Sequence, residues 1–379
     1  MTRSKTLLVT MLGLCTLAAC GDPPLVKTNP PGFRKDVFNQ EAASKIDVLW
    51  VIDNSGSMAD KQQELSTGLS RFMELFNRGL VDYRIAVTTT DVFNDQGNFV
   101  GTPAIITPKL GDPVAAFQKN VKVGTGGKGL EQGLEAARLA IDRQMKLAAE
   151  VLAKRKTCRT GCRAGATAQK CSDDCDVKFN PEFMRPDAHL YLVFVSDEED
   201  HSFGEVRYFQ RFFESAQGVG NEGAVNVSAI CGDAPQSACK NAEAGKRYVD
   251  LAISTGGLFG SICDTTFDKH LENLALNAVG LKRKFSLSKE PETDTLDVKV
   301  KYRCDTPKAQ MGKCDAVDES ECAGKGPELL GKLCTPPQGP TSGWTFETGT
   351  NALLFNGDSV PGLRSAVEVS YIAVDKSAH

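Results

Sequence analysis

Two runs of apolar residues that stop on an aspartate limit most strongly how this chain can fold. Val48–Ile52 is followed directly by Asp53, and the run from His189 to Val195 is followed by Ser196 and Asp197. Continuously apolar strands are buried on both faces, as in a mainly parallel sheet covered by helices. Such sheets bind ligands beyond the carboxyl ends of their strands. We therefore expect both aspartates at the same edge of one sheet.

Helical and strand patterns alternate along the chain. Apolar spacing predicts helices from Met58 onwards and over residues 128–154, 203–216, 246–254 and 268–279, with further strands over 83–87 and 225–230. This alternation predicts a doubly wound, Rossmann-like α/β domain over residues 45–283.

The C-terminal part has a different pattern. The stretch "TLDVKVKYR", which begins at Thr295, alternates apolar with polar residues, and 344–346, 352–355 and 366–373 are further strand candidates. Residues 284–379 are therefore expected to form a small β-rich module with a cysteine-rich loop over 304–334.

The N-terminus has the features of an export signal. Arg3 and Lys5 precede a short apolar stretch that ends in Leu17-Ala18-Ala19-Cys20, an order typical of secretory signals. The cysteine at the exit resembles the bacterial lipobox, which implies a signal peptide over 1–19 and a lipid on Cys20. Gly21 then favours the outer membrane, with the lipid as the only anchor. An ordinary signal peptide with a chance cysteine is the alternative. Prolines over 20–44 predict an extended tether.

Charge and cysteine content limit the classes of protein to which this chain can belong. Lys+Arg number 44 and Asp+Glu 48, for a net charge of −4, whereas nucleic-acid-binding proteins carry a basic excess. Of the 13 cysteines, an odd number remain without Cys15 and Cys20. Export makes disulfides the default, and at least one remaining thiol is then free or pairs with another chain.

The segment after the first apolar run is rich in oxygen ligands. Asp53, Ser55 and Ser57 place three oxygen-bearing side chains within five residues. Carboxylate and hydroxyl oxygens suit Mg²⁺, Mn²⁺ or Ca²⁺. A second carboxylate is then needed, and Asp197 supplies it; Thr125 is the only hydroxyl in the glycine-rich loop over 123–129. The alternative is a plain helix start, with Ser57 as the cap.

Together these residues resemble the von Willebrand factor type A domain and its metal-ion-dependent adhesion site. That site has Asp-x-Ser-x-Ser after the first strand, a threonine in a later loop and an aspartate after the fourth strand. The resemblance implies a bound Mg²⁺ (or Ca²⁺ or Mn²⁺) and an open coordination position for a carboxylate of a protein partner. The implied ligands are Asp53, Ser55, Ser57, Thr125 and Asp197.

Two departures from the family pattern matter. The family usually has Thr-Asp-Gly at the second aspartate, whereas here Ser196 precedes Asp197, and Glu198, Glu199 and Asp200 follow it. These extra acids either repel an acidic partner or add ligands that favour Ca²⁺. A cysteine-rich insertion also lengthens the chain between Thr125 and Asp197.

We expect a binding module and not an enzyme: a divalent-cation-dependent lipoprotein of the bacterial envelope with an adhesion or scaffold role. The sequence "NSGSM" lacks the Gly-x-Ser-x-Gly pattern of a nucleophilic serine, and His201 is the only histidine near the acidic run. The alternatives are a structural envelope lipoprotein with a non-functional metal site, or a metal-dependent hydrolase that uses the acidic loop.

The insertion, at about 156–178, contains two Cys-x3-Cys pairs. This spacing places both sulfurs of a pair on one face of a helix. A hairpin of two such helices brings Cys158 to Cys175 and Cys162 to Cys171, as in the twin Cys-x3-Cys hairpins of small disulfide proteins that the segment resembles. A four-cysteine zinc site is the alternative, which the spacing and the export signal disfavour.

The remaining cysteines fall into two groups. Cys239 and Cys263 are expected to pair, and Cys231, at the end of a buried strand, is the candidate for a free thiol. The last four are expected to pair among themselves in one of three ways: Cys304, Cys314, Cys322 and Cys334.

Overall fold

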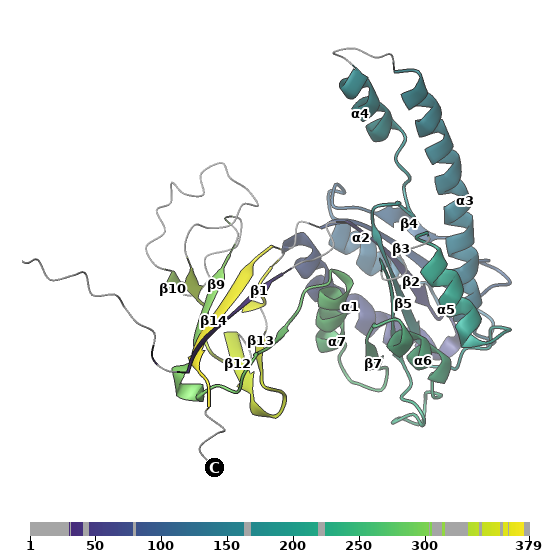
Figure 1. The fold of residues 1–379 in the computed structure, drawn as a ribbon. Coiled ribbons are helices and arrows are strands. Elements are labelled where there is room, and N and C mark those ends of the chain that lie inside the picture. Colours follow the sequence, from purple (N-terminus) through teal and green to yellow (C-terminus); the bar gives the residue numbers. More distant parts are fainter. Residues whose placement is uncertain are drawn as a thin grey trace, which may run out of the picture.

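The structure is a computed structural model, and it contains an α/β domain beside a β-rich module (Figure 1). It describes residues 30, 32–40, 45–78, 81–162, 168–218, 224–302, 304, 313–314, 333–340, 343–356, 359–362 and 364–374. The expected signal peptide, Cys20 and Cys322 lie outside these residues. None of the described helices is long and apolar enough to cross a membrane.

The α/β domain is built on a six-stranded sheet with the order β4-β3-β2-β5-β6-β7. All neighbouring strands run parallel except β4, which pairs antiparallel with β3. The strands are β2 (Lys45–Ile52), β3 (Asp82–Thr89), β4 (Val100–Ile106), β5 (His189–Ser196), β6 (Val225–Cys231) and β7 (Phe259–Ser261).

Helices cover both faces of this sheet (Figure 1). One face packs against α1 (Ala59–Arg78), α2 (Pro113–Asn120) and α7 (Asp268–Ala278). The other packs against α3 (Gly133–Thr160), α5 (Val206–Ser215) and α6 (Lys246–Ser254). The predicted doubly wound α/β fold is therefore confirmed.

The central strand β2 shows why this sheet needs two helical layers. Its side chains alternate between the two apolar cores: Val48, Trp50 and Ile52 lie in one, and Leu49 and Val51 in the other. The Trp50 ring meets the rings of Phe72 on α1 and Phe117 on α2 edge to face. A strand that is apolar throughout can bury itself only between two layers.

Two helix starts differ from the sequence prediction. The helix expected from residue 128 begins at Gly133 and continues to Thr160, and the one expected from Phe203 begins at Val206. Tertiary hydrogen bonds account for both delays. The carbonyl of Glu131 accepts from the N–H of His201 (2.7 Å), and Gln132 donates its N–H to the carbonyl of Thr90 (3.3 Å). Arg247 donates to the carbonyls of Ser202 (3.1 Å) and Gly204 (2.8 Å).

The β-rich module contains a five-stranded and a three-stranded sheet around one apolar core. The larger sheet has the order β1-β14-β9-β11-β10 and the smaller β12-β13-β8. The strands are β1 (Phe33–Asn39), β8 (Lys284–Ser286), β9 (Asp297–Lys301), β10 (Lys313–Cys314), β11 (Cys334–Thr335), β12 (Gly343–Glu347), β13 (Ala352–Asn356) and β14 (Ala366–Ile372).

The expected tether needs one correction. Residues 33–39, which the prolines placed in the tether, form β1 and pair antiparallel with β14. Only part of β1 is half-buried, so its apolar pattern is weak in the sequence. After β1, the buried Gln40 donates its side-chain amide to the carbonyls of Lys282 (2.7 Å) and Pro361 (3.0 Å), which fixes the entry into the α/β domain.

The cysteine pairing follows the prediction at the positions that the structure describes. Disulfides join Cys158 to Cys175, Cys162 to Cys171 and Cys239 to Cys263. The first two link the end of α3 to α4 (Ala168–Lys178). Cys231 is free and buried, and burial raises the pKa of its thiol. Cys304 and Cys334 are both disulfide-bonded.

A buried arginine holds the amino ends of β2 and β3 together. The Arg185 guanidinium donates through Nε to Asp47 Oδ1 (2.8 Å) and through Nη1 to Asp82 Oδ2 (2.8 Å). Its Nη2 also donates to the carbonyl of Ile46 (2.9 Å). Burial raises the pKa of Asp47 to about 6, and Arg185 opposes that rise. The carboxyl is therefore still ionised at pH 7 and depends on Arg185 for its charge partner.

Replacement of Arg185 by methionine is expected to lower the free energy of unfolding by about 3–5 kcal/mol, because it leaves the Asp47 carboxyl buried without its charge partner, so that the group must stay charged and unpaired or take up a proton. The double variant Arg185→Met/Asp47→Asn is expected to recover much of that loss. Urea denaturation of both variants at pH 7 measures this. A double variant no more stable than Arg185→Met would show that the ion pair is not the cause.

Candidate metal-binding site at the sheet edge

The end of β2 places Asp53 at the centre of the carboxyl edge of the sheet. The residue is fully buried, and its backbone N–H donates to the carbonyl of Val195 on β5 (2.9 Å). Its carboxylate accepts hydrogen bonds from the backbone N–H of Ser55 (2.7 Å) and from the hydroxyl of Ser196 (2.6 Å). Asp53 is therefore fixed by its own loop and by the neighbouring strand.

A chain of hydroxyl contacts then joins the first loop to the second aspartate. Ser55 Oγ lies 3.0 Å from Ser57 Oγ, and Ser57 Oγ donates to Asp197 Oδ1 (3.0 Å). The structure thus brings together four of the five expected ligands: Asp53, Ser55, Ser57 and Asp197. The Ser57 hydroxyl points to these side chains, and a plain helix cap would bond a backbone N–H instead.

The fifth expected ligand is placed differently. Thr125 is exposed, and within the described part of the chain its hydroxyl makes no hydrogen bond to the other four residues. Its loop does reach the same edge, since Gly127 bonds Asn54, and Gln62 on α1 bonds both the N–H (3.1 Å) and the carbonyl (2.7 Å) of Gly124.

The same loop carries a carboxylate that the sequence analysis did not select. Glu131 is fully buried, and Thr90 at the end of β3 donates its hydroxyl to Oε2. The backbone carbonyl of Glu131 accepts a hydrogen bond from the N–H of His201 (2.7 Å). The predicted helix over 128–154 hid this residue, because it would have made Glu131 an ordinary helical acid.

Burial and mutual repulsion both act on these carboxyl groups. Burial, with the charge of Asp53 as the next cause, raises the pKa of Glu131 to about 8. Burial and Asp53 also raise the pKa of Asp197, although its hydrogen bond from Ser57 opposes the rise. Three carboxyl groups from three loops therefore share one partly desolvated edge.

The acidic run after Asp197 has mostly structural partners. Asp200 is buried and accepts from the backbone N–H of Leu134 at the start of α3 (3.0 Å) and from Arg247 Nε (2.8 Å). Glu199 Oε1 accepts from the backbone N–H groups of Asp200 (2.8 Å) and Arg247 (3.1 Å). Glu198 differs, because burial and the charges of Asp53 and Asp197 raise its pKa.

The donor set at this edge fits a hard divalent cation. Its atoms are carboxylate and hydroxyl oxygens, which suit Mg²⁺, Ca²⁺ and Mn²⁺. Among the described residues, the buried Glu131 Oε1 and Asn54 Oδ1 have no hydrogen-bond partner. Buried oxygens in native structures normally have a hydrogen-bond or metal partner, so these two oxygens require an ion or a water molecule. Glu131 is therefore an additional candidate ligand beside Asp53, Ser55, Ser57 and Asp197. In the part of the chain that the structure describes, the carboxylate oxygens of Asp53, Glu131 and Asp197 do not all lie within 4.8 Å of one another.

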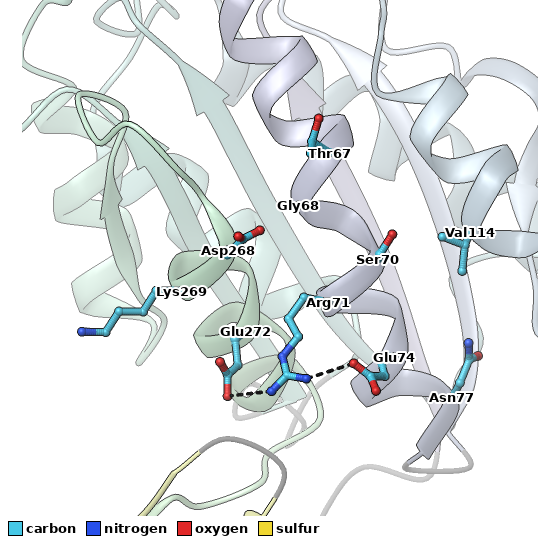
Figure 2. A pocket seen from close by; sticks show the side chains of 10 residues that line it. All are labelled: Thr67, Gly68, Ser70, Arg71, Glu74, Asn77, Val114, Asp268, Lys269 and Glu272. Carbon is cyan, nitrogen blue, oxygen red and sulfur yellow. Dashed lines mark hydrogen bonds and ion pairs between the residues drawn. The ribbon is translucent and has the colours of Figure 1, made fainter. Parts of the chain in front are cut away.

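A cavity of about 1000 Å³ lies elsewhere, between α1 and α7 (Figure 2). Arg71 on α1 crosses it and pairs with Glu74 (3.0 Å) and with Glu272 on α7 (3.7 Å). Its lining contains none of the candidate ligands. The cavity is therefore a groove between helices and not part of the candidate metal site.

Comparisons with known proteins give only distant matches. No protein-family model and no curated protein matches the sequence. A von Willebrand factor type A protein from Catenulispora acidiphila is 14% identical, with 91% of this chain and 66% of that chain covered and a TM-score of 0.35. The pilus adhesin SpaC from Lactobacillus rhamnosus GG, in its open conformation, is 12% identical, with 91% and 41% covered and a TM-score of 0.39.

A third match is proximal thread matrix protein 1 from the mussel byssus, which is 14% identical, with 65% of this chain and 47% of that chain covered and a TM-score of 0.31. The chain thus spans 66% or less of the length of these three structures. These TM-scores are too low for any property of the matched proteins to be transferred to this chain. The fold is assigned from the strand order and the helix layers of the chain itself.

Gly127→Ala is expected to destabilise the sheet edge, because the added Cβ would lie 2.2 Å from Asn54 Oδ1 and 2.8 Å from the Asn54 carbonyl oxygen. We expect a loss of about 1–3 kcal/mol in the free energy of unfolding, measured by urea denaturation. Gly126→Ala is the matched control, since its Cβ would meet nothing within 4 Å. Equal stability of the two variants would contradict the close approach of the loops.

Proposed function

We propose that this chain is a divalent-cation-dependent protein-binding module with an adhesion or scaffold role. The observation that carries the proposal is the continuous contact from Ser55 through Ser57 to Asp197, beside the buried Asp53. These residues come from the loops after β2 and β5, and Gly127 of a third loop bonds Asn54 beside them, which a simple helix cap does not require. Mg²⁺ is the proposed ion, with Ca²⁺ or Mn²⁺ as the alternatives.

In this proposal Asp53, Ser55, Ser57, Glu131 and Asp197 supply the oxygens that hold the ion. The bound cation provides a positive centre on an otherwise acidic edge and leaves a coordination position for an outside ligand. Ser57 is exposed, so that position faces the solvent. The proposed outside ligand is an acidic side chain of a protein partner.

The hydrogen bonds made by residues 198–200 favour an acidic protein partner more strongly than the sequence of these residues does. Asp200 is paired with Arg247, and Glu199 accepts two backbone hydrogen bonds. Of the three extra acids, Glu198 therefore remains as the main source of repulsion or as an additional ligand. This makes repulsion of a partner carboxylate weaker than three unpaired acids would imply.

Localisation is a second part of the proposal. The lipobox-like segment that ends at Cys20 supports a bacterial envelope lipoprotein, anchored by its lipid and placed at the outer membrane. In this arrangement the binding module acts outside the cytoplasm without covalent chemistry, and the disulfides of the hairpin are consistent with an oxidising compartment.

Titration calorimetry with Mg²⁺ and Ca²⁺ tests the metal site directly. Ser57→Ala and Glu131→Gln are each expected to weaken binding at least about tenfold, since even changes behind the ligands of metal sites have effects of that size. Thr125→Ala is the matched control, and we expect it to bind like the unchanged protein. Loss of binding in Thr125→Ala but not in Glu131→Gln would restore Thr125 as the ligand.

Two other outcomes would support the alternative functions. Absence of binding heat, together with a thermal stability that metal leaves unchanged, would remove the adhesion site and favour a structural envelope protein. Metal-dependent turnover of generic ester, peptide or phosphate substrates would favour a hydrolase.

A further inference from the structure

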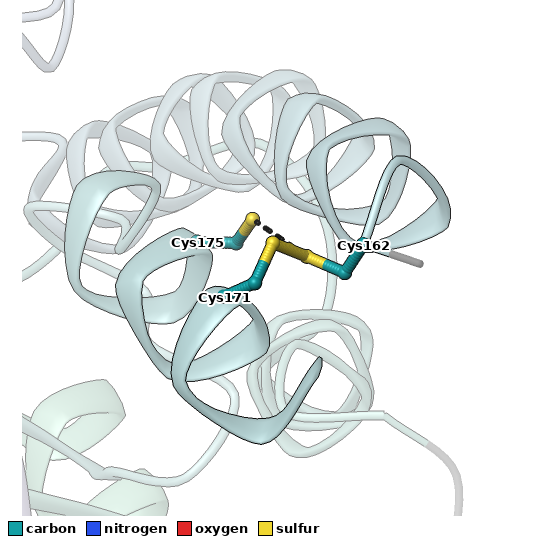
Figure 3. Close-up of side chains that lie close together, drawn as sticks. All are labelled: Cys162, Cys171 and Cys175. Carbon is teal, nitrogen blue, oxygen red and sulfur yellow. Dashed lines mark hydrogen bonds between the residues drawn. A yellow bond between two sulfur atoms is a disulfide. The ribbon is translucent and has the colours of Figure 1, made fainter. Parts of the chain in front are cut away.

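The hairpin of α3 and α4 brings two disulfides into contact with each other. Figure 3 shows one of them, between Cys162 and Cys171, beside the sulfur of Cys175. Cys162 Sγ, which is bonded to Cys171, lies 3.9 Å from Cys175 Sγ, which is bonded to Cys158. The sulfurs of Cys162, Cys171 and Cys175 all lie within 4.8 Å of one another. The fourth sulfur, of Cys158, is covalently bonded to this group, so one small volume contains all four.

These four sulfurs lie far from the core that supports the candidate oxygen site. α3 has 28 residues, and Ala148 is the last of them that is buried. The remainder projects away from the sheet with α4 (Figure 1). Cys158, Cys162 and Cys171 are partly exposed, so a reducing dithiol can reach the disulfides, and only Cys175 is buried.

One sulfur–sulfur distance between the two disulfides matches tetrahedral metal coordination. Zinc–sulfur bonds are about 2.3 Å long, so sulfurs around a tetrahedral zinc lie about 3.8 Å apart. The contact between Cys162 and Cys175 already has that length. The Cα atoms of each disulfide pair are 5.8 Å apart, which leaves room for each pair of sulfurs to separate once their bond is broken.

The charges of the tip suit such a centre. Four thiolates around one divalent ion carry a net charge of −2. Arg155 and Lys156 lie on α3 beside Cys158, and Arg159 follows it. Arg159 pairs with Asp176, and Asp173 and Asp174 oppose part of this positive charge. The basic residues beside the cysteines favour the thiolate form that a metal needs.

We propose that the hairpin is a latent thiolate site for zinc or a similarly soft divalent ion, which forms when both disulfides are reduced. Each disulfide accepts two electrons and two protons from one dithiol, which is oxidised to its own disulfide. Binding of the ion by Cys158, Cys162, Cys171 and Cys175 then releases four thiol protons. The ion replaces the two disulfides as the link between α3 and α4, so the hairpin stays closed in both redox states.

This site is chemically distinct from the oxygen site at the sheet edge. Soft thiolate ligands select zinc, whereas carboxylate and hydroxyl oxygens suit Mg²⁺ and Ca²⁺. A result that disproves Mg²⁺ binding at the oxygen site therefore does not affect the thiolate site. A result that disproves the thiolate site likewise does not affect Mg²⁺ binding.

The test uses the full chain, reduced with a phosphine under nitrogen and titrated with Co²⁺ and then Zn²⁺. We expect the near-ultraviolet thiolate-to-cobalt absorption to saturate at one Co²⁺ per chain and one Zn²⁺ to abolish it. The oxidised chain should show no such band. Zinc should also protect these four cysteines of the reduced chain from alkylation at least tenfold, as read by peptide mass spectrometry.

Three variants show which cysteines produce the cobalt absorption band. Cys158→Ser/Cys171→Ser should lose the one-to-one cobalt band, whereas Cys239→Ser/Cys263→Ser and Ser57→Ala should keep it. Far-ultraviolet circular dichroism of the reduced chain checks the fold: zinc should restore the helical signal that reduction removes. Equal alkylation with and without zinc, or an unchanged band in Cys158→Ser/Cys171→Ser, would overturn the proposal.

Discussion

The buried carboxylate of Asp53 is the interaction on which the sheet edge depends. One oxygen accepts the N–H of Ser55 in its own loop, and the other accepts the hydroxyl of Ser196 at the end of the next strand. The carboxylate therefore fixes the positions of both loops that carry the other candidate ligands. A buried charge is stable only when it is well hydrogen-bonded, and these donors meet that requirement in part.

The third loop adds a buried carboxyl group that ionises only with difficulty. Glu131 is buried, and its pKa is raised first by burial and then by the charge of Asp53. A divalent cation would offset that repulsion and provide partners for the orphan oxygens of Glu131 and Asn54. By contrast, Asp200 is balanced within the chain by Arg247 and the start of α3. The acids of this region thus divide into structural residues and candidate ligands.

Two further parts of the chain, the disulfide hairpin and the β-rich module, are attached to this α/β domain. The hairpin extends α3 beyond its last buried residue and depends on covalent links because it has little core of its own. The β-rich module takes its first strand from before the α/β domain and its others from after it, so β1 and β14 meet in one sheet. Gln40 connects that sheet to the segment after α7.

The sequence by itself determined the α/β class, because apolar runs such as Val48–Ile52 can be buried only between two helical layers. It also determined the hairpin pairing, because the Cys-x3-Cys spacing fixes the face of each helix. Tertiary structure alone decided that β1 joins β14, since a half-exposed edge strand leaves a weak apolar pattern. It also decided that Glu131 is buried whereas Thr125 is exposed. The burial and charge environment of a loop side chain come from segments distant in the sequence, here the ends of β2 and β3, and local patterns do not contain that information.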